Sequence, residues 1–253
     1  MKVRELVQVT RGFVASDGDG VRLTRFIGGP DLPGVDPFLL LDCFGSEQPG
    51  DYIGGFPDHP HRGFETVTYM LAGRMRHRDS RGHEDVIGPG DLQWMTAGRG
   101  LVHSEMPEQS EGLMKGFQLW VNLPAADKMC EPAYRSVRQS ELPVERLGSG
   151  GLIKVMAGLT DGGTEGALKI PTVTPIFFDV SLDAAGDFTQ AVPLSHSGFI
   201  YVIDGSLRVG GRATALQSES LGVLGPGDQV MLKSGASGAR FLLVAGRELR
   251  EPI

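Results

Sequence analysis

Short apolar segments alternate with turn residues along the whole chain. The clearest segments have four to seven residues and are rich in Val, Ile, Phe and Thr, which is typical of β-strands. Gly, Pro and Asp separate them, and residues 17–20 and 27–30 have the composition of turns. Only residues 125–138 resemble a helical turn, and Pro132 limits it. The pattern predicts an all-β fold with few short helices, whose clearest strands are residues 38–41, 65–71, 117–123, 176–182, 199–203 and 241–244.

Two elements of the first half recur in the second half in the same order. Residues 69–73 (YMLAG) are echoed by residues 201–205 (YVIDG), at an offset of 132. Residues 88–91 (GPGD) are repeated as residues 225–228, at an offset of 137. A longer hairpin tip would absorb the difference between the two offsets, because added loop length costs little. The repetition indicates an internal duplication.

The length of the chain agrees with two copies of one β-domain. Eight strands with short connections need about 90 residues, so two jelly-roll barrels fit into 253 residues. Pro143 and the glycine-rich run at residues 148–151 are typical of a linker. We therefore expect an N-terminal domain over residues 1–135 and a C-terminal domain over residues 136–253.

Composition narrows the class of protein further. The 37 glycines and 16 prolines make up about a fifth of the chain, against roughly 12% in average proteins, which excludes a helical bundle. A net charge of −7 disfavours nucleic acid as a partner. Cys43 and Cys130 form no disulfide framework and are expected to be buried thiols, and no stretch has the pattern of a signal peptide or a membrane span. We expect a cytoplasmic protein that does not bind membranes.

Two pairs of polar side chains have the spacing of metal ligands. His59 and His61 lie two residues apart, which places both imidazoles on one face of an extended strand. His103 and Glu105 repeat this spacing with an imidazole and a carboxylate. Imidazole and carboxylate are ligands of first-row divalent metals. Four protein ligands in an octahedron leave two positions open, which points to a substrate or dioxygen.

The second half lacks the corresponding ligands. At the two offsets of the duplication, His59 and His61 fall on Ala191 and Pro193, and His103 and Glu105 fall on Arg240 and Leu242. His196 is the one histidine of that half, and a single imidazole does not hold a divalent ion. We expect the C-terminal domain to be degenerate and free of metal, in a structural or partner-binding role.

Several of these segments resemble known motifs. Residues 55–65 (GFPDHPHRGFE) resemble the first cupin motif, and residues 98–103 (GRGLVH) resemble the second. A more specific set resembles the pirin family over about residues 10–135, while the second half matches only in outline. The segments that carry the pirin resemblance are residues 36–42, 59–65, 77–82, 91–98, 103–105 and 119–124.

The resemblance implies a bicupin whose N-terminal barrel holds one metal ion, Fe(II), on His59, His61, His103 and Glu105. Other first-row metals can occupy such a site in purified protein. Many cupins take the carboxylate from the first motif, where Glu65 stands here, whereas pirins take it from the second, which favours Glu105. Glu65 lies four residues past His61, so strand geometry alone leaves it open, either as the ligand or as an acceptor that orients a ligand histidine.

The resemblance also implies two alternative functions. Some pirins are similar to the quercetin 2,3-dioxygenases, in which the metal coordinates the substrate hydroxyl and dioxygen. In that case the substrate is a flavonol or another enolic compound, and Glu105 accepts the hydroxyl proton. Other pirins act as iron-dependent regulators that sense redox state and bind a transcription factor or a metabolic enzyme. Two barrels on one chain form the pseudo-dimer that single-domain cupins reach by association, so we expect a monomer.

The remaining candidates are expected to serve the fold. His77 and His83 are interpreted as residues of a hairpin tip between the two motifs. Phe64, Trp94 and Met95 are expected to belong to the core rather than to a surface that binds substrate.

Overall fold

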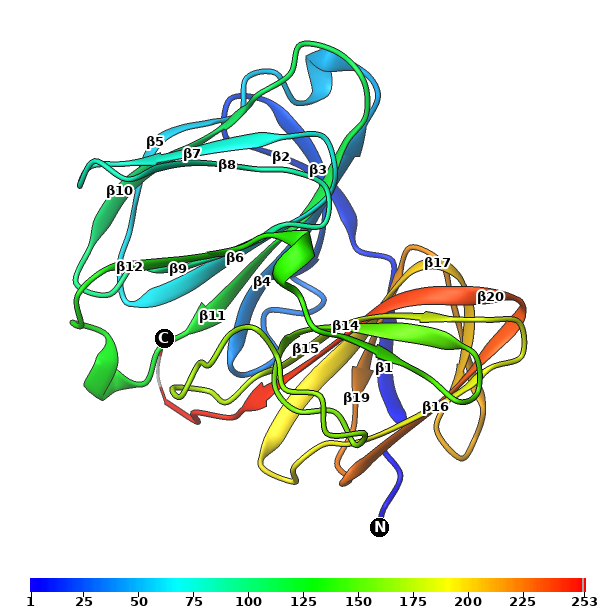
Figure 1. The fold of residues 1–253 in the computed structure, drawn as a ribbon. Coiled ribbons are helices and arrows are strands. Elements are labelled where there is room, and N and C mark those ends of the chain that lie inside the picture. Colours follow the sequence, from blue (N-terminus) through cyan, green and yellow to red (C-terminus); the bar gives the residue numbers. More distant parts are fainter. Residues whose placement is uncertain (252) are drawn as a thin grey trace. The chain divides into compact units, whose positions relative to one another are not determined.

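The computed structural model describes residues 1–251 and 253 and divides the chain into two compact β-units (Figure 1). The N-terminal barrel comprises Phe13–Gly34, Phe38–Glu141 and Glu251–Ile253, and the C-terminal barrel comprises Met1–Gly12, Val35–Pro37 and Leu142–Arg250. The all-β prediction is confirmed. The helical elements of the described residues are three single 3-10 turns, η1 (Pro49–Asp51), η2 (Ala125–Asp127) and η3 (Gln139–Glu141).

Backbone pairing divides the chain differently from the expected boundary after residue 135. That boundary falls inside β12 (Ala133–Val137), which pairs with β9 (Leu92–Thr96) of the N-terminal barrel, so the division follows Glu141. At the other end, β1 (Leu6–Thr10) pairs with β19 (Ser220–Leu224), so the first twelve residues belong to the C-terminal barrel. An edge strand belongs to the sheet with which its backbone forms hydrogen bonds. The local sequence of such a strand does not specify which sheet that is.

The N-terminal barrel consists of two antiparallel sheets that face each other in Figure 1. Met75 and Ile87 of the small sheet pack against Phe44, Met70 and Met114 of the large sheet to form a core between them. The large sheet has the order β12, β9, β6 (Phe64–Ala72), β11 (Met114–Asn122), β4 (Phe38–Ser46), β3 (Val21–Ile27) and β2 (Phe13–Asp17). The small sheet has the order β5 (Phe56–His61), β10 (Leu101–Pro107), β7 (Met75–Asp79) and β8 (Glu84–Ile87).

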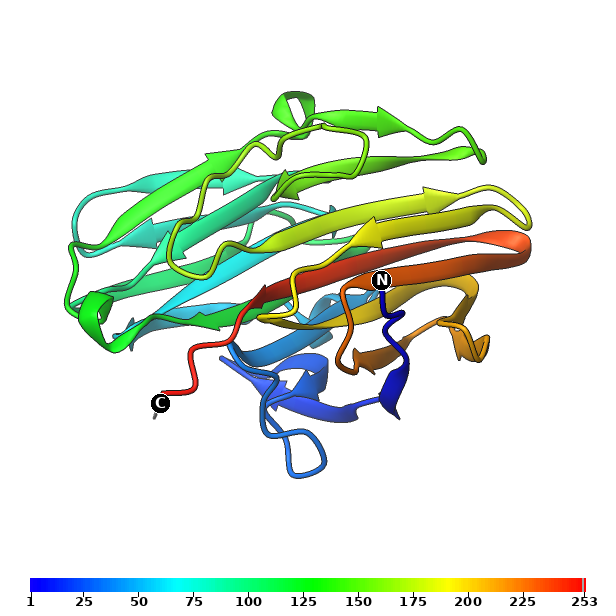
Figure 2. The same ribbon diagram turned by 90° about the horizontal axis from the view of Figure 1, so that it is seen from below.

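The C-terminal barrel is built from one nine-stranded antiparallel sheet. The pairing of its two longest strands is irregular at two places, between Val202 and Asp204 and between Gly205 and Leu207. Because such irregularities bend strands, a single sheet can curl around its own core. The longest, β20, is orange to red in Figure 2. The main path is β1, β19, β17 (His196–Val209), β20 (Gln229–Arg247), β15 (Ile176–Leu182), β14 (Gly151–Ala157) and β13 (Val144–Arg146), with β16 (Asp187–Ala191) on β20 and β18 (Thr214–Gln217) on β17.

The duplicated segments occupy comparable places in the two barrels. Residues 69–72 end β6 and Gly73 directly follows it, and residues 201–205 lie in β17 where its pairing shifts. Gly73 and Gly205 have φ of 78° and 75°, a left-handed conformation that glycine adopts without steric cost. Residues 88–91 and 225–228 directly precede β9 and β20. Within the described part of the chain, no helix is long and apolar enough to span a membrane.

Candidate metal centre

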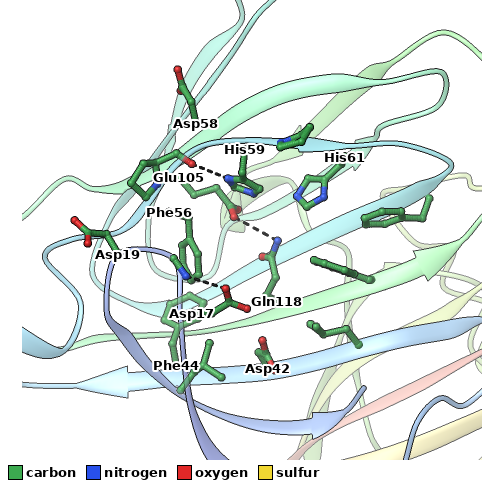
Figure 3. A pocket seen from close by; sticks show the side chains of 17 residues that line it. Asp17, Asp19, Asp42, Phe44, Phe56, Asp58, His59, His61, Glu105 and Gln118 are labelled. Carbon is green, nitrogen blue, oxygen red and sulfur yellow. Dashed lines mark hydrogen bonds between the residues drawn. The ribbon is translucent and has the colours of Figure 1, made fainter. Parts of the chain in front are cut away.

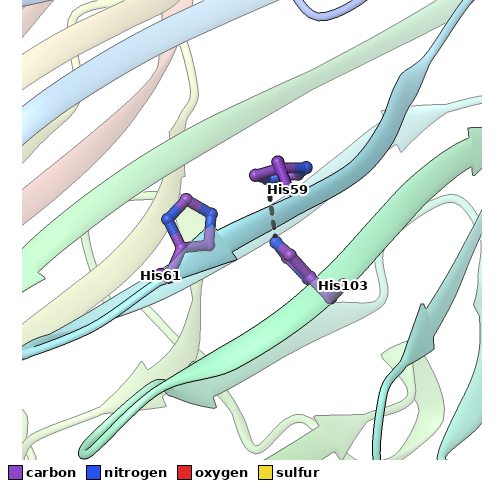
Figure 4. A group of neighbouring side chains, drawn as sticks. All are labelled: His59, His61 and His103. Atoms are coloured by element: carbon purple, nitrogen blue, oxygen red, sulfur yellow. Dashed lines mark hydrogen bonds between the residues drawn. The ribbon is translucent and has the colours of Figure 1, made fainter.

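Two neighbouring strands of the small sheet carry the histidines. β5 and β10 run antiparallel, and His59 lies directly opposite His103. His61 lies two residues further along β5, on the same face as His59. Figure 4 shows the three imidazoles directed toward one another. Their ligand atoms all lie within 4.8 Å of one another, so the structure brings together the three histidines that the spacing predicted.

The spacing of the ring nitrogens fits a single ion. The Nε2 atoms of His59 and His103 lie 3.1 Å apart. Two nitrogens that each bind an ion at about 2.1 Å in adjacent octahedral positions would be separated by about 3.0 Å. The ring centroids of His59, His61 and His103 lie 4.5 to 4.9 Å apart, so no ring blocks another from the shared space.

Two of the three imidazoles, His61 and His103, are held in the neutral form that binds metals. Burial, followed by the charges of its neighbours, lowers the pKa of His61 to about 4, and burial likewise lowers the pKa of His103 to about 4. Both rings are therefore neutral at physiological pH. The Nδ1–H of His59 donates to the carbonyl oxygen of Pro57 at 2.8 Å, which leaves the lone pair on Nε2. The buried Nε2 of His61 has no hydrogen-bond partner among the described residues, as expected for an atom whose partner is an ion.

Glu105 lies beside the three histidines but outside the group that they form. A register irregularity follows His103 on β10, and the buried Glu105 carboxylate faces the same cavity as His59 and His61 (Figure 3). The Thr68 hydroxyl donates to its Oε1 at 2.9 Å, and the Gln118 amide lies 3.5 Å from Oε2.

These contacts decide the charge of Glu105. Burial by itself would raise the pKa of the Glu105 carboxyl. The positive charges that the imidazoles of His77 and His103 carry when protonated, together with the Thr68 hydroxyl, outweigh burial and hold the pKa of Glu105 below its usual range. Glu105 is consequently an ionised acceptor at neutral pH.

A cavity of about 620 Å³ opens beside the histidines. Phe64 and Trp120 form part of its wall, with ring centroids 4.7 Å apart, and Trp120 also lies 5.2 Å from the ring of His61. Phe64 therefore faces the cavity, which differs from the expectation that it belongs to the core. It directly follows the turn that reverses the chain after His61. The buried Trp94 and Met95 do not line the cavity. The other apolar side chains of the wall are Leu23, Leu40, Phe44 and Phe56.

Glu65 is turned away from this cavity. The chain reverses between His61 and Glu65, so the two residues belong to different strands, β5 and β6, and their spacing of four does not measure facing along one strand. The Glu65 carboxylate accepts a hydrogen bond from the Thr96 hydroxyl at 2.6 Å, whereas Thr68, an odd number of residues along β6, points toward Glu105. Of the two candidate carboxylates, only Glu105 lines the cavity.

The interpretation of His77 as a hairpin-tip residue is wrong. His77 lies inside β7 and is buried, and burial lowers its pKa. The turn instead begins at Asp79, whose carboxylate accepts from the backbone N–H groups of Arg81 and His83. The alternation Met75-Arg76-His77-Arg78-Asp79 was the available signal, because it places both arginines on one face and His77 on the other. His83 does lie at the tip.

Gly98, in the second motif, allows the loop between β9 and β10 to pack closely against neighbouring backbone. The Gly63 N–H donates to the Gly98 carbonyl oxygen at 2.8 Å, which ties the turn after His61 to the loop before His103. Gly98 has φ of 51°, and a Cβ atom at this position would lie 2.2 Å from the carbonyl oxygen of Cys130.

Gly98→Ala is therefore expected to destabilise the protein by at least about 3 kcal/mol, because the clash is with backbone that cannot yield locally. Gly82→Ala is the matched control. Gly82 has φ of 88° with nothing within 4 Å of the added Cβ, so it should cost only about 1–2 kcal/mol. Chemical denaturation of both variants measures the difference, and equal destabilisation would contradict the packing argument.

The C-terminal barrel uses the corresponding positions for other contacts. Arg240 forms a two-point ion pair with the buried Asp179, at 3.0 and 2.7 Å. Leu242 is buried, and the imidazole of His196 hydrogen-bonds the Thr174 carbonyl oxygen at 2.9 Å. Across the described residues, His59, His61 and His103 are the one cluster of His, Cys, Asp and Glu side chains arranged to hold a metal.

Two family profiles match the chain. The profile described as Pirin matches residues 20–121, and the profile described as Pirin C-terminal cupin domain matches residues 177–253. The second match places a cupin domain in the half whose sequence resembled the family only in outline.

Individual proteins agree with these profiles over the full chain. A pirin-like protein of Caulobacter vibrioides is 50% identical, with 100% of this chain and 91% of the relative covered. A Pseudomonas aeruginosa protein provisionally assigned as a quercetin 2,3-dioxygenase is 47% identical, with 100% and 90% covered. The crystal structure of a quercetin 2,3-dioxygenase from Acinetobacter baumannii is 30% identical and superposes with a TM-score of 0.89 over 99% of this chain and 89% of that chain.

Proposed function

The chain belongs to the pirin family, and from this premise we propose that its N-terminal barrel binds one Fe(II) and catalyses the dioxygenation of a flavonol or another enolic compound. The observation that carries the proposal is the convergence of three imidazoles and an ionised carboxylate on the wall of one large, mainly apolar cavity. A structural metal site needs no such cavity. A volume of about 620 Å³ lies in the range of pockets that enclose small organic ligands.

The donor set suits a divalent first-row metal. His59, His61 and His103 would hold the ion through ring nitrogens, and Glu105 would supply the carboxylate. When bound, the ion supplies Lewis acidity toward a substrate hydroxyl and redox chemistry toward dioxygen. The same donors accept other first-row metals, so the identity of the ion in the cell is part of the proposal.

The chain's own residues bind and orient the substrate. The faces of Trp120 and Phe64 offer a stacking surface to an aromatic ring. Glu105, ionised and held by Thr68 and Gln118, is placed to accept the proton of a substrate hydroxyl. The apolar wall keeps water away from the reacting ring. The assigned activities of the P. aeruginosa and A. baumannii proteins support this reading.

Dioxygen consumption tests the proposal. Protein reconstituted with Fe(II) under anaerobic conditions should consume dioxygen when quercetin or another enolic compound is added, with release of carbon monoxide from quercetin. Metal-free protein is the control. Fully loaded protein that consumes no dioxygen with any compound of a broad enolic panel would overturn the enzymatic proposal and favour an iron-dependent regulator.

The metal content should be one ion per chain. The C-terminal barrel offers His196 alone, and its Nε2 is already occupied by the Thr174 carbonyl oxygen. His196→Ala should therefore leave the metal content at one per chain. Elemental analysis of protein purified without chelators measures both values. Two ions in the wild type, with one lost in His196→Ala, would contradict the assignment of the C-terminal barrel as free of metal.

A further inference from the structure

A second cavity of about 350 Å³ lies in the N-terminal barrel and shares no lining residue with the cavity beside the histidines. Its lining includes His77, Gln93, Tyr134 and Ser136. We call it the rear cavity. His77 belongs to its wall and does not line the cavity beside the histidines.

His77 lies between the rear cavity and Glu105. The two residues are cross-strand partners on β7 and β10. Each is 3% exposed, and the Nδ1 of His77 lies 3.4 Å from Oε1 of Glu105. A shift of about 0.5–0.7 Å would bring this pair to the 2.7–2.9 Å of a charge-assisted hydrogen bond.

An imidazole is energetically unfavourable at a buried position that only fills space. Both ring nitrogens of His77 are buried, and neither forms a hydrogen bond of normal geometry within the described residues, although the nearby Gln93 side chain interacts with the ring. A buried polar group without a partner costs about 1–3 kcal/mol, so an apolar side chain would be more stable there. We therefore infer that a ring nitrogen of His77 serves a purpose beside the Glu105 carboxylate.

The rear cavity can set which nitrogen of His77 carries the proton. The Tyr134 hydroxyl is buried without a partner among the described residues and lines the same cavity as His77. A water molecule in this polar cavity could bond to both the Tyr134 hydroxyl and Nε2 of His77. With Nε2 accepting from that water, the ring proton resides on Nδ1, which faces Glu105.

We propose that His77 is a positioning residue, which donates its Nδ1–H to Oε1 of Glu105 and thereby orients this carboxylate toward the metal-binding imidazoles, with water in the rear cavity fixing the ring. Thr68 donates to the same Oε1 and Gln118 faces Oε2, so the carboxylate is held from three directions. The inference rests on the proposed metal centre. It does not require that the bound metal perform dioxygenation.

The test uses Co(II) as a spectroscopic probe in the full-length protein. His77→Leu removes the donor and keeps an apolar side chain of similar size, whereas His77→Asn places an amide N–H close to the position of Nδ1. We expect His77→Leu to weaken Co(II) binding by about 10- to 100-fold and to change the visible Co(II) absorption, which depends on coordination geometry. His77→Asn should restore the wild-type spectrum and most of the affinity.

Two further variants keep the test decisive. His196→Ala alters the histidine of the C-terminal barrel, which bonds to the Thr174 carbonyl oxygen, and should leave the Co(II) spectrum unchanged. If His77→Leu does not fold, His77→Gln replaces it, because its longer side chain carries the amide past the Nδ1 position while tolerating burial. Circular dichroism and the melting temperature establish that each variant is folded.

The possible outcomes separate this inference from the proposed function. A folded His77→Leu, or His77→Gln in its place, with the affinity and spectrum of the wild type would overturn the inference. Wild-type protein that binds no Co(II) would overturn both the metal centre and the role of His77. Protein that binds Co(II) and responds to His77 substitution, but shows no dioxygen consumption with Fe(II), would support the inference and contradict only the dioxygenase activity.

Discussion

Replacing His103 by alanine is expected to reduce metal affinity by more than about 100-fold and to remove dioxygen consumption. The side chain is 1% exposed and its Nε2 lies 3.1 Å from that of His59, so no other described residue can take its place in the group of three. Loss of a residue that merely orients a ligand costs about 10- to 100-fold in affinity, and loss of the ligand itself should cost more. Calorimetric titration with Fe(II) under anaerobic conditions measures the change.

The control for His103→Ala is a histidine of the same barrel that does not face the site. His83 lies at the hairpin tip and bonds to Asp79 through Nδ1, at 2.9 Å. His83→Ala should retain metal affinity within a few-fold of the wild type. A folded His103→Ala that binds Fe(II) as tightly as His83→Ala would mean that the three imidazoles do not share an ion.

Replacing Glu105 by glutamine is expected to lower kcat by about 10²- to 10⁴-fold at saturating metal, because the amide cannot accept a proton from the substrate hydroxyl. The exchange preserves the shape of the side chain and can keep a contact with Thr68. Oxygen-electrode kinetics with quercetin or the best enolic substrate measure the effect.

Glu65→Gln is the matched control for this variant. Both carboxylates are buried, and both accept from a threonine hydroxyl, but Glu65 bonds to Thr96 and does not line the cavity. Its kcat should remain within a few-fold of the wild type. The reverse result, with Glu65→Gln inactive and Glu105→Gln active, would assign the carboxylate to the first motif after all.

Local sequence patterns predicted the parts of the site that depend on strand periodicity. The spacing of His59 and His61 is informative because side chains two residues apart share a face in any strand. The duplicated segments at residues 69–73 and 201–205 indicated two similar barrels for a comparable reason, since turn residues at repeated positions impose the same local conformation.

Features that depend on the pairing of distant strands could not be read from local patterns. The N-terminal strand β1 joins β19 of the C-terminal barrel, and nothing within residues 6–10 specifies a partner more than 200 residues away. The position of His77 beside Glu105 likewise depends on the register between β7 and β10. The direction of the Glu65 side chain could not be predicted from its spacing to His61. A turn separates the two residues, so the spacing does not run along a single strand.

The central claim is that His59, His61 and His103 share one divalent metal ion inside the N-terminal barrel. Anomalous diffraction at the iron edge, from crystals of protein reconstituted with Fe(II) under anaerobic conditions, tests it directly. We predict one strong anomalous peak per chain, within bonding distance of a ring nitrogen of each of the three histidines. Iron located elsewhere in the chain, with the three imidazoles not coordinating it, would contradict the account.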